Sequence, residues 1–196
     1  MAQKRKRTQL VKKRKKKTWF SILAPTEFGK KELGECYLAD KKELVGKRIR
    51  VNMMAVARTR NPNVRLTFEV KDVKEDICIS DLVLYNLLPV SIKRMARKGK
   101  TKIDISKILK SKDGELVVKY IIVTKNKVPG GVSRAINNAS VDLISSEIKK
   151  KNSSDVFDSV INYSLQKDMK DKLKKIYPVD TFEVRYLKKR EKTQKL

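Results

Sequence analysis

The sequence contains no histidine, one tryptophan and two cysteines among its 196 residues, and aromatic residues make up only 6% of it. The absence of histidine removes the most common general base for a serine or cysteine nucleophile. The carboxylates Asp72, Glu75 and Asp76 cluster in an expected turn with no recognisable apolar pocket beside it. These features predict that the protein is not an enzyme.

Cys36 and Cys78 lie far apart in the sequence, each among apolar residues. There is no CxxC pair and no histidine-rich spacing, so we expect two reduced core thiols, no bound metal and no cofactor. No apolar run approaches the roughly 18 to 20 residues that span a bilayer, and the basic N-terminus adjoins no signal-peptide segment. We therefore expect a cytoplasmic protein without a membrane partner.

Two glycine-containing stretches bear a superficial likeness to nucleotide-binding loops. Gly99-Lys100-Thr101 lacks the required upstream glycine, whose position is occupied by Arg94, and it leads from a helix into a strand instead of the reverse. Pro129-Gly130-Gly131 has no GxGxxG frame. We interpret the first as a helix C-terminus and the second as a turn before a helix, and we expect no small-molecule substrate.

Positive charge is the dominant feature of the composition. Lysine and arginine total 49 against 22 aspartates and glutamates, which gives a formal net charge of +27. Self-repulsion of this size destabilises a compact state unless a polyanion neutralises it, and nucleic acid is the abundant cellular polyanion. Lysine outnumbers arginine in the basic runs, which suits phosphate neutralisation better than bidentate base readout.

The basic residues are distributed over many predicted elements, which favours contact with a large polyanion over the reading of one groove. For Lys4 to Arg7 alone, a solvated face or a localisation signal is an equally good interpretation. The predicted RNA contacts are Lys4, Arg5, Lys6, Arg7, Lys12, Lys13, Arg14, Lys15, Lys16 and Lys17 in an arm, Trp19, Arg48 and Arg50 on a strand face, Lys93, Arg94, Arg97 and Lys98 on a helix face, Lys100, the loop residues Lys125, Lys127 and Arg134, and Lys188, Lys189 and Arg190 in a tail.

The composition divides the chain into a disordered basic arm at 1–17, one globular α+β domain at 18–187 and a basic tail at 188–196. Alternating apolar residues predict strands over 47–53 and 64–71, each with one buried and one wet face. A second pair is predicted over 101–109 and 115–123, joined by a hairpin in which Asp113-Gly114 supplies a positive φ.

Helical periodicity is expected over 87–99, with Pro89 at the first helical position and Gly99 closing the helix. In the C-terminal third, apolar steps of three or four predict one helix through Ile136, Ala139, Leu143 and Ile148, and a second pattern from Phe157 to Ile176, either continuous or broken near Gln166. Ser153 or Ser154 is expected to cap this second pattern and Pro178 to end it. A last strand at 181–187, with Phe182, Val184 and Tyr186 on one face, is predicted to rejoin the sheet.

The only tryptophan, Trp19, stands where the basic run 12–17 gives way to the apolar stretch 19–23. Trp19 could stack on a base, as aromatic residues do in single-strand binders. Its apolar neighbours favour the alternative that it packs on the domain and anchors the arm. In that case Trp19→Ala is expected to cost about 3 kcal/mol or more.

Several stretches, in this order and spacing, resemble one known family over about residues 17–187. They are Trp19-Phe20 followed by Ala24-Pro25, Val45-Gly46-Lys47-Arg48, LTFEV at 66–70, TKIDISKILKSKDGELVVK at 101–119 and IYPVDTFEV at 176–184. The family is the archaeal and eukaryotic small-subunit ribosomal protein family S-three-a-e, also called eukaryotic-type S-one.

The resemblance implies a structural constituent of the small ribosomal subunit, on the platform near the messenger exit and the 3′ end of the small-subunit rRNA. It implies a curved, largely antiparallel sheet approaching a β-barrel, with helices packed around it and a basic arm against rRNA. The implied partners are that rRNA, neighbouring platform proteins and the messenger RNA at its exit. The composition alone leaves open a free DNA- or chromatin-binding protein or a ribosome-assembly factor.

Overall fold

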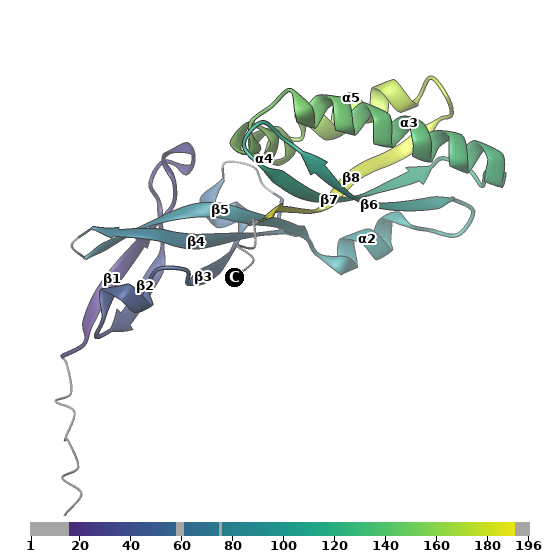
Figure 1. The fold of residues 1–196 in the computed structure, drawn as a ribbon. Coiled ribbons are helices and arrows are strands. Elements are labelled where there is room, and N and C mark those ends of the chain that lie inside the picture. Colours follow the sequence, from purple (N-terminus) through teal and green to yellow (C-terminus); the bar gives the residue numbers. More distant parts are fainter. Residues whose placement is uncertain (1–15, 58–60, 75, 191–196) are drawn as a thin grey trace, which may run out of the picture.

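A computed structural model describes residues 16–57, 61–74 and 76–190 (Figure 1). Its eight strands form one open sheet in the order β2-β1-β5-β8-β7-β6, while β4 also pairs with β5 and β3 pairs with β4. Only the pairing of β1 with β5 is parallel. The strands are β1 (Thr18–Leu23), β2 (Glu32–Leu38), β3 (Arg48–Asn52), β4 (Val64–Lys74), β5 (Ile77–Leu87), β6 (Lys102–Lys110), β7 (Glu115–Thr124) and β8 (Val179–Arg190).

Helices lie on both faces of the C-terminal half of this sheet (Figure 1), and one short helix, Met53–Val56, contacts β3 and β4 in the other half. They are α1 (Met53–Val56), α2 (Pro89–Met95), α3 (Gly130–Lys149), α4 (Ser153–Ile161) and α5 (Ser164–Leu173), with short 3-10 turns η1 (Thr26–Phe28) and η2 (Lys41–Glu43). Figure 1 shows α3, α4 and α5 above β6, β7 and β8, and α2 below them. The predicted α+β class, with a mainly antiparallel sheet, is confirmed.

The implied closure towards a barrel is not observed, because the sheet branches at β5. Residues 77–79 of β5 pair with β1, whereas residues 84–86 pair with β8. The strands β1 to β4 and the strands β6 to β8 therefore extend in different directions from one shared strand (Figure 1). Within the described residues, none of the strands β1 to β4 pairs with β6, β7 or β8, and the sheet is open.

The strands predicted at 47–53 and 64–71 exist and pair with each other as β3 and β4. In β4 the predicted apolar set, Val64, Leu66, Phe68 and Val70, is buried. Thr67, expected on the wet face, is also buried. The alternation correctly identified the core face, whereas the burial of Thr67 depends on tertiary neighbours.

The hairpin predicted between 101–109 and 115–123 is confirmed, but its turn chemistry differs from the prediction. Lys110 pairs with Glu115, which leaves a four-residue connection at 111–114. Neither Asp113 nor Gly114 has a positive φ, because a longer connection does not need the mirror-image geometry of a two-residue turn. Instead, the backbone N–H and the hydroxyl of Ser111 both donate to the carbonyl oxygen of Gly114, at 2.8 and 2.9 Å.

Two helix boundaries differ from the predictions. α2 ends at Met95, because Ala96 already leaves the helical region with ψ 75°. Gly99, expected to close the helix, lies in the following turn with φ +82°. Gly130 and Gly131, expected to form a turn, are the first two residues of α3, and Pro129 takes the N-cap position.

The apolar pattern from 157 to 176 forms two helices, but the break precedes Gln166. α4 ends before Asn162, and Tyr163 adopts a left-handed φ of +65°. Gln166 is buried, and its Nε2 donates to the carbonyl oxygen of Val160 (3.0 Å), which satisfies the end of α4.

The ends of this helical pair also differ from the predictions. The cap of α4 is Asn152, which forms a capping box with Asp155, and not Ser153 or Ser154. α5 ends at Leu173, five residues before Pro178, and Ile176 is exposed. The local sequence therefore predicted where the helices lie better than it predicted which residues cap and end them.

β8 rejoins the sheet, as predicted, and the structure places it between β5 and β7. Tyr120 pairs with Val184 and Lys119 with Tyr186, so Arg185 forms a bulge. A bulge reverses the alternation, and Leu187 is buried in place of Tyr186. β8 continues to Arg190, so the basic residues 188–190 are part of the sheet.

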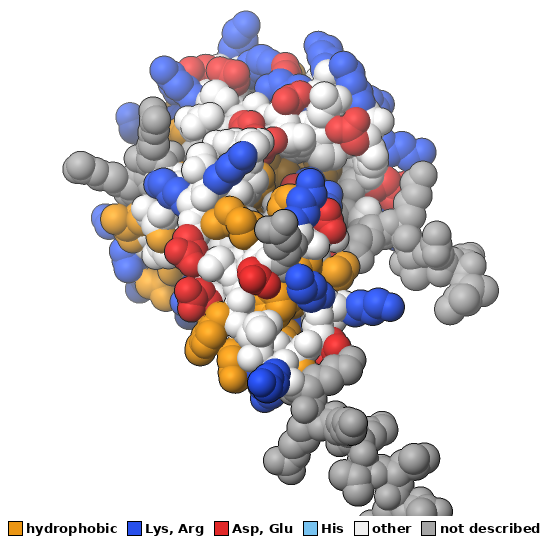
Figure 2. Space-filling model, turned by 90° about the vertical axis from the view of Figure 1, so that its left-hand side faces the viewer, with side chains coloured by type: hydrophobic (Ala, Val, Ile, Leu, Met, Phe, Trp, Pro, Cys, Tyr) orange, Lys and Arg blue, Asp and Glu red, His pale blue; other side chains and the backbone are white. Residues whose placement is uncertain are grey.

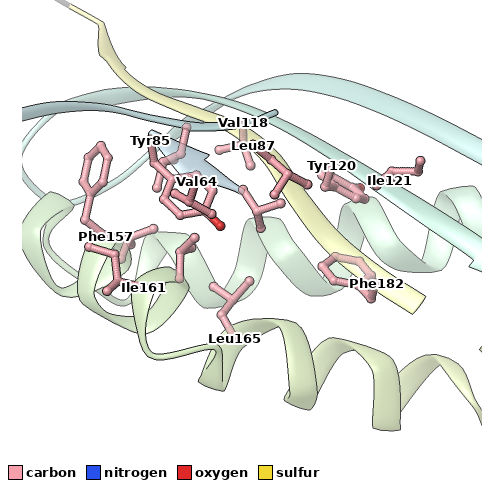
Figure 3. Packing of buried hydrophobic residues seen from close by; sticks show 14 of the residues in the cluster. Val64, Tyr85, Leu87, Val118, Tyr120, Ile121, Phe157, Ile161, Leu165 and Phe182 are labelled. Atoms are coloured by element: carbon pink, nitrogen blue, oxygen red, sulfur yellow. The ribbon is translucent and has the colours of Figure 1, made fainter. Parts of the chain in front are cut away.

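The main core lies between the helices and the sheet. Figure 3 shows Phe157, Ile161 and Leu165 of α4 and α5 beside Tyr85 and Val118 of the sheet. The rings of Tyr120 and Phe182 stack with centroids 5.3 Å apart, and the hydroxyls of Tyr120 and Ser140 are 3.1 Å apart. Each such buried side chain contributes about 1.5 to 3 kcal/mol.

A smaller core lies in the N-terminal half and consists of Phe20, Ile22, Leu44, Val70 and Cys78. Both cysteines are free thiols, and Cys36 is only half-buried. Burial, and to a lesser degree the neighbouring Cys36, raises the pKa of the Cys78 thiol. Among the described residues, no helix is long and apolar enough to cross a membrane.

Candidate nucleic-acid interface

One end of the sheet brings together three segments that are distant in sequence. The backbone N–H of Thr124, at the end of β7, donates to the carbonyl oxygen of Thr101 before β6 (3.0 Å). The N–H of Lys125 donates to the carbonyl oxygen of Pro178 before β8 (3.1 Å). The α2–β6 connection, the β7–α3 loop and the start of β8 therefore meet at the right-hand end of the molecule in Figure 1.

A buried threonine holds these segments in place. The hydroxyl of Thr124 donates to the carbonyl oxygen of Asn126 (2.6 Å) and accepts from the N–H of Thr101 (3.1 Å). The hydroxyl of Thr101 in turn accepts from the N–H of Val128 (3.0 Å). These bonds fix the backbone that carries the lysines on both sides.

The cations of this region form what we call the basic end, made of Arg97, Lys98, Lys100, Lys125 and Lys127. All except Lys100 are exposed, and Lys100 is half-buried. The sequence placed them on a helix face and in a separate loop. The structure unites the two groups, because β6 and β7 are antiparallel and the start of one lies beside the end of the other.

Asp180 is the acidic residue at the centre of this region. Its carboxylate forms an ion pair with Lys100. The hydrogen bond from Lys100 lowers the pKa of Asp180, and the positive charges of Lys170 and Lys125 add to this effect. Lys170, on α5, is thus a further cation beside the basic end, and the sequence alone did not predict this because 45 residues separate it from Lys125 in the chain.

Other predicted cations lie near the basic end along the chain. Lys93 and Arg94 are exposed on α2, and Arg134 is exposed on the first turns of α3. Nε of Arg97 donates to the carbonyl oxygen of Arg94 (3.4 Å), which ties the turn after α2 to the helix. The predicted helix face therefore continues into the basic end.

Arg48 and Arg50 occupy a different part of the molecule, on edge strand β3. Both are exposed, as is Arg65 on β4. Nε of Arg48 contacts Oε2 of Glu69 at 2.5 Å, which balances part of the charge on this strand. These residues form a second basic area, separate from the basic end.

The cations predicted in the C-terminal tail are largely engaged within the fold. Lys189 lies 2.9 Å from Asp81, which also pairs with Lys71 at 2.6 Å. Burial alone would raise the pKa of Asp81, but the hydrogen bonds from Lys189 and Lys71 lower it overall. Nζ of Lys189 also lies 5.7 Å from the ring centre of Phe157.

Of the two neighbours of Lys189, Arg190 also forms an ion pair within the fold. Arg190 pairs with Glu115 at 2.9 Å. Lys188 is half-buried within β8. Internal carboxylates therefore balance two of the three predicted tail cations.

The prediction that Trp19 packs on the domain is wrong, since 62% of its surface is exposed. β1 alternates, and its buried face carries Phe20 and Ile22, which anchor the strand in the smaller core. The ring of Trp19 lies on Tyr37 of β2, with centroids 4.8 Å apart and a tilt of 36°. Sequence reasoning missed Tyr37 because only the β1–β2 register places it opposite Trp19.

Two residues of the predicted basic arm are described by the structure. Lys16 and Lys17 are exposed, and Nζ of Lys17 lies 5.7 Å from the ring centre of Tyr37. The predicted contacts at 4–7 and 12–15 lie outside the described residues.

The described part of the chain has little that could support catalysis. It contains no group of three or more histidines, cysteines or carboxylates arranged to hold a metal. A cavity of about 610 Å³ lies between η1, α1 and α4, with Glu27 and Asp158 in its lining. Burial raises the pKa of both carboxyls; the charge of Asp158 adds to the rise for Glu27, and the charge of Asp155 adds to the rise for Asp158. The nearby Lys31 Nζ donates to the carbonyl oxygen of Val56 (3.0 Å).

The fold and the surface define a strongly basic α+β protein whose exposed lysines and arginines are suited to a polyanion. A model of the Ribosomal S3Ae family matches residues 4–192, and the chain belongs to this family. It is a family of ribosomal proteins and not of enzymes.

Individual relatives match along most of their length. The small ribosomal subunit protein eS1 of Nanoarchaeum equitans is 30% identical over 182 residues, covering 91% of this chain and 92% of the relative. The protein of the same name from Picrophilus torridus is 27% identical over 173 residues, covering 87% and 83%. That of Methanobrevibacter smithii is 26% identical over 172 residues, covering 87% and 89%.

Proposed function

We propose that this chain is a structural constituent of the small ribosomal subunit that binds rRNA through phosphate and shape contacts. Its membership of the ribosomal S3Ae family over residues 4–192 carries the proposal. The platform near the messenger exit and the 3′ end of the rRNA is the site that the resemblance implies. Neighbouring platform proteins and the messenger are the other partners it implies.

The basic end is the main rRNA contact of the folded domain in this proposal. It presents exposed cations from two segments that hydrogen bonds hold together, with Asp180 as the acid between them. Four of its five cations are lysines, which act as point charges towards phosphates and do not specify bases. Together with Lys93, Arg94 and Arg134, they suit the backbone of a folded RNA.

Arg48 and Arg50 on β3 and the basic arm are further contacts in this proposal. The arm contributes 4–7 and 12–17, and its high charge density suits insertion between rRNA segments that repel one another. Lys188, Lys189 and Arg190 are weaker candidates, because Asp81 and Glu115 already balance two of them.

Sedimentation of a native lysate tests the assignment. The chain is expected to sediment with small subunits at low salt and in amounts equal to those of other subunit proteins. RNase treatment should release it, whereas DNase should not, since a chromatin protein would show the opposite response. Absence from small subunits at low salt would refute the proposal, and substoichiometric amounts would favour an assembly factor.

Charge variants test the role of the basic end. Changing Lys98, Lys125 and Lys127 to glutamine is expected to weaken rRNA binding and to lower the slope of log affinity against log salt by roughly 0.7 to 0.9 for each phosphate that is no longer neutralised. The matched control changes Lys107, Lys110 and Lys112, which are equally exposed near the opposite end of β6. Equal weakening in both triple variants would show that net charge alone matters.

The arm is tested in the same assay. Changing Lys12, Lys13, Arg14 and Lys15 to glutamine is expected to weaken RNA binding and to flatten its salt dependence. The domain should remain folded, because the residues of its two cores all follow residue 19. An unchanged salt slope would remove the arm from the interface.

A further inference from the structure

The N-terminal half of the sheet exposes an aromatic pair on a flat strand surface. Trp19 on β1 and Tyr37 on β2 are direct cross-strand partners, and their rings are in contact while 62% and 49% of their surfaces remain exposed. Their mutual contact limits the motion of each ring. The pair is therefore held in an orientation that leaves an exposed π-surface.

The surrounding strand surface extends this exposed face. Ser21 pairs with Ile77 and Leu23 with Ile79, so both isoleucines lie on the same side of the sheet as Trp19. Both are exposed. The opposite side of β1 is buried through Phe20 and Ile22, which makes the strand a rigid support. Figure 2 views the molecule from the side of β1 and β2 and shows exposed hydrophobic side chains there beside Lys and Arg.

The charges beside the pair identify the kind of partner. Nζ of Lys17 lies 5.7 Å from the ring centre of Tyr37, and Lys17 ends the run of six cations at 12–17. An exposed aromatic pair with cations at one edge fits a ligand that has a π-face and a phosphate in each unit. Unpaired nucleotides have both, whereas the bases of a duplex are stacked on one another and cannot reach the rings.

We propose that Trp19 and Tyr37 form a stacking platform for unpaired RNA nucleotides, with Lys17 contacting the adjoining phosphate. The proposal rests on the proposed function. It adds a preference for single-stranded RNA to contacts that otherwise recognise the phosphates and the shape of the RNA. The other basic areas are proposed to contact phosphates, which single strands and duplexes both present. Within the described residues, the platform is the surface proposed to distinguish the two forms.

Because Trp19 is the only tryptophan, its fluorescence reports on this platform in the full chain. The protein is titrated with an unstructured oligoribonucleotide and, separately, with the same sequence as a perfect duplex, both labelled for anisotropy. The single strand is expected to quench Trp19 as it binds. The duplex is expected to bind through the basic areas with little quenching.

Variants separate stacking from charge and from folding. Trp19→Ala and Tyr37→Ala are each expected to lower single-strand affinity by about 5- to 150-fold, the equivalent of 1 to 3 kcal/mol per stacked base, and to leave duplex affinity unchanged. Trp19→Phe should retain most of the affinity. Ile108→Ala, an equally exposed apolar position on β6, is the matched control. Circular dichroism verifies that every variant is folded.

The outcomes distinguish the platform from the function on which it rests. Equal quenching by the duplex, or wild-type single-strand affinity in both alanine variants, would overturn the platform and leave rRNA binding intact. If neither RNA form binds and the chain is absent from small subunits, the proposed function itself fails.

Discussion

The stability of the N-terminal half of the sheet should depend on Phe20 and not on its neighbour Trp19. Phe20 is 1% exposed and packs with Ile22, Leu44, Val70 and Cys78. Truncation of a buried phenylalanine to alanine removes its transfer free energy and leaves a cavity, so Phe20→Ala is expected to cost about 3 to 5 kcal/mol. This loss is a large fraction of the roughly 5 to 15 kcal/mol that stabilises a typical protein.

Trp19→Ala should behave differently although it removes a larger side chain. Most of the indole is already in water, and the substitution mainly removes the ring pair with Tyr37. Aromatic pairs contribute about 0.5 to 1.5 kcal/mol beyond their area burial. We therefore expect a cost of no more than about 1.5 kcal/mol, below the roughly 3 kcal/mol that truncation of a buried anchor would cost.

Urea unfolding followed by far-UV circular dichroism measures both variants with one probe, because Trp19→Ala removes the only fluorescent tryptophan. Val45→Ala, at an exposed apolar position, is the control and should shift stability by no more than about 0.5 kcal/mol. A destabilisation of Trp19→Ala equal to that of Phe20→Ala would refute this reasoning. It would mean that Trp19 is buried in the folded protein.

Three further outcomes follow from buried or paired polar groups. Burial raises the pKa of Glu183, despite the hydrogen bond from Tyr163 (2.9 Å). The folded state therefore favours the neutral carboxyl, and the protein loses stability as the pH rises from the ordinary pKa of glutamate to the raised one. Glu183→Gln should be more stable than the wild type in urea at pH 7 and should lose this advantage near pH 3. Thr124→Val should lower stability by about 1 to 3 kcal/mol, since it removes two hydrogen bonds of a buried hydroxyl, with the N–H of Thr101 and the carbonyl oxygen of Asn126, and an unchanged urea midpoint would contradict this. Asp180→Asn should strengthen rRNA binding at low salt, because it removes the acid that balances Lys100, and weaker binding by anisotropy would argue against the basic end as an interface.

Local patterns were sufficient for those parts of the fold that depend on periodicity. The alternation in β4 identified Val64, Leu66, Phe68 and Val70 as one buried face. Apolar steps of three or four located α3 and its buried Ile136 and Ile148. Between them Ser140 and Ile144 are buried, whereas the predicted Ala139 and Leu143 are only partly buried. Periodicity succeeds here because one side of each element is buried whatever the partner is.

Helix caps were predicted poorly, because several local sequences can satisfy the same helix end. The break near Gln166 was one of two alternatives, and the bulge in β8 was not predicted. Asn152 caps α4 although serines follow it, and the break before α5 depends on a left-handed Tyr163 whose hydroxyl reaches Glu183 in β8. The bulge at Arg185 arises from the pairing of β8 with β7, and it places Leu187 in the core. The break and the bulge depend on partners more than 15 residues away in the chain. The cap depends on which of several adjacent residues, all able to cap a helix, takes the N-cap position.

The sequence by itself determined the charge, the absence of histidine chemistry, the strand and helix faces and the resemblance to a ribosomal family, because these follow from composition and from short-range order. Only the tertiary structure decided which cations lie near one another and where Trp19 lies. The antiparallel pairing of β6 and β7 brings Lys100 near Lys125, and the ion pair with Asp81 engages Lys189 within the fold. The β1–β2 register places Tyr37 under Trp19, whereas Phe20 faces the core. Pairing between distant strands decides such neighbours, and no local pattern encodes the register that brings them together.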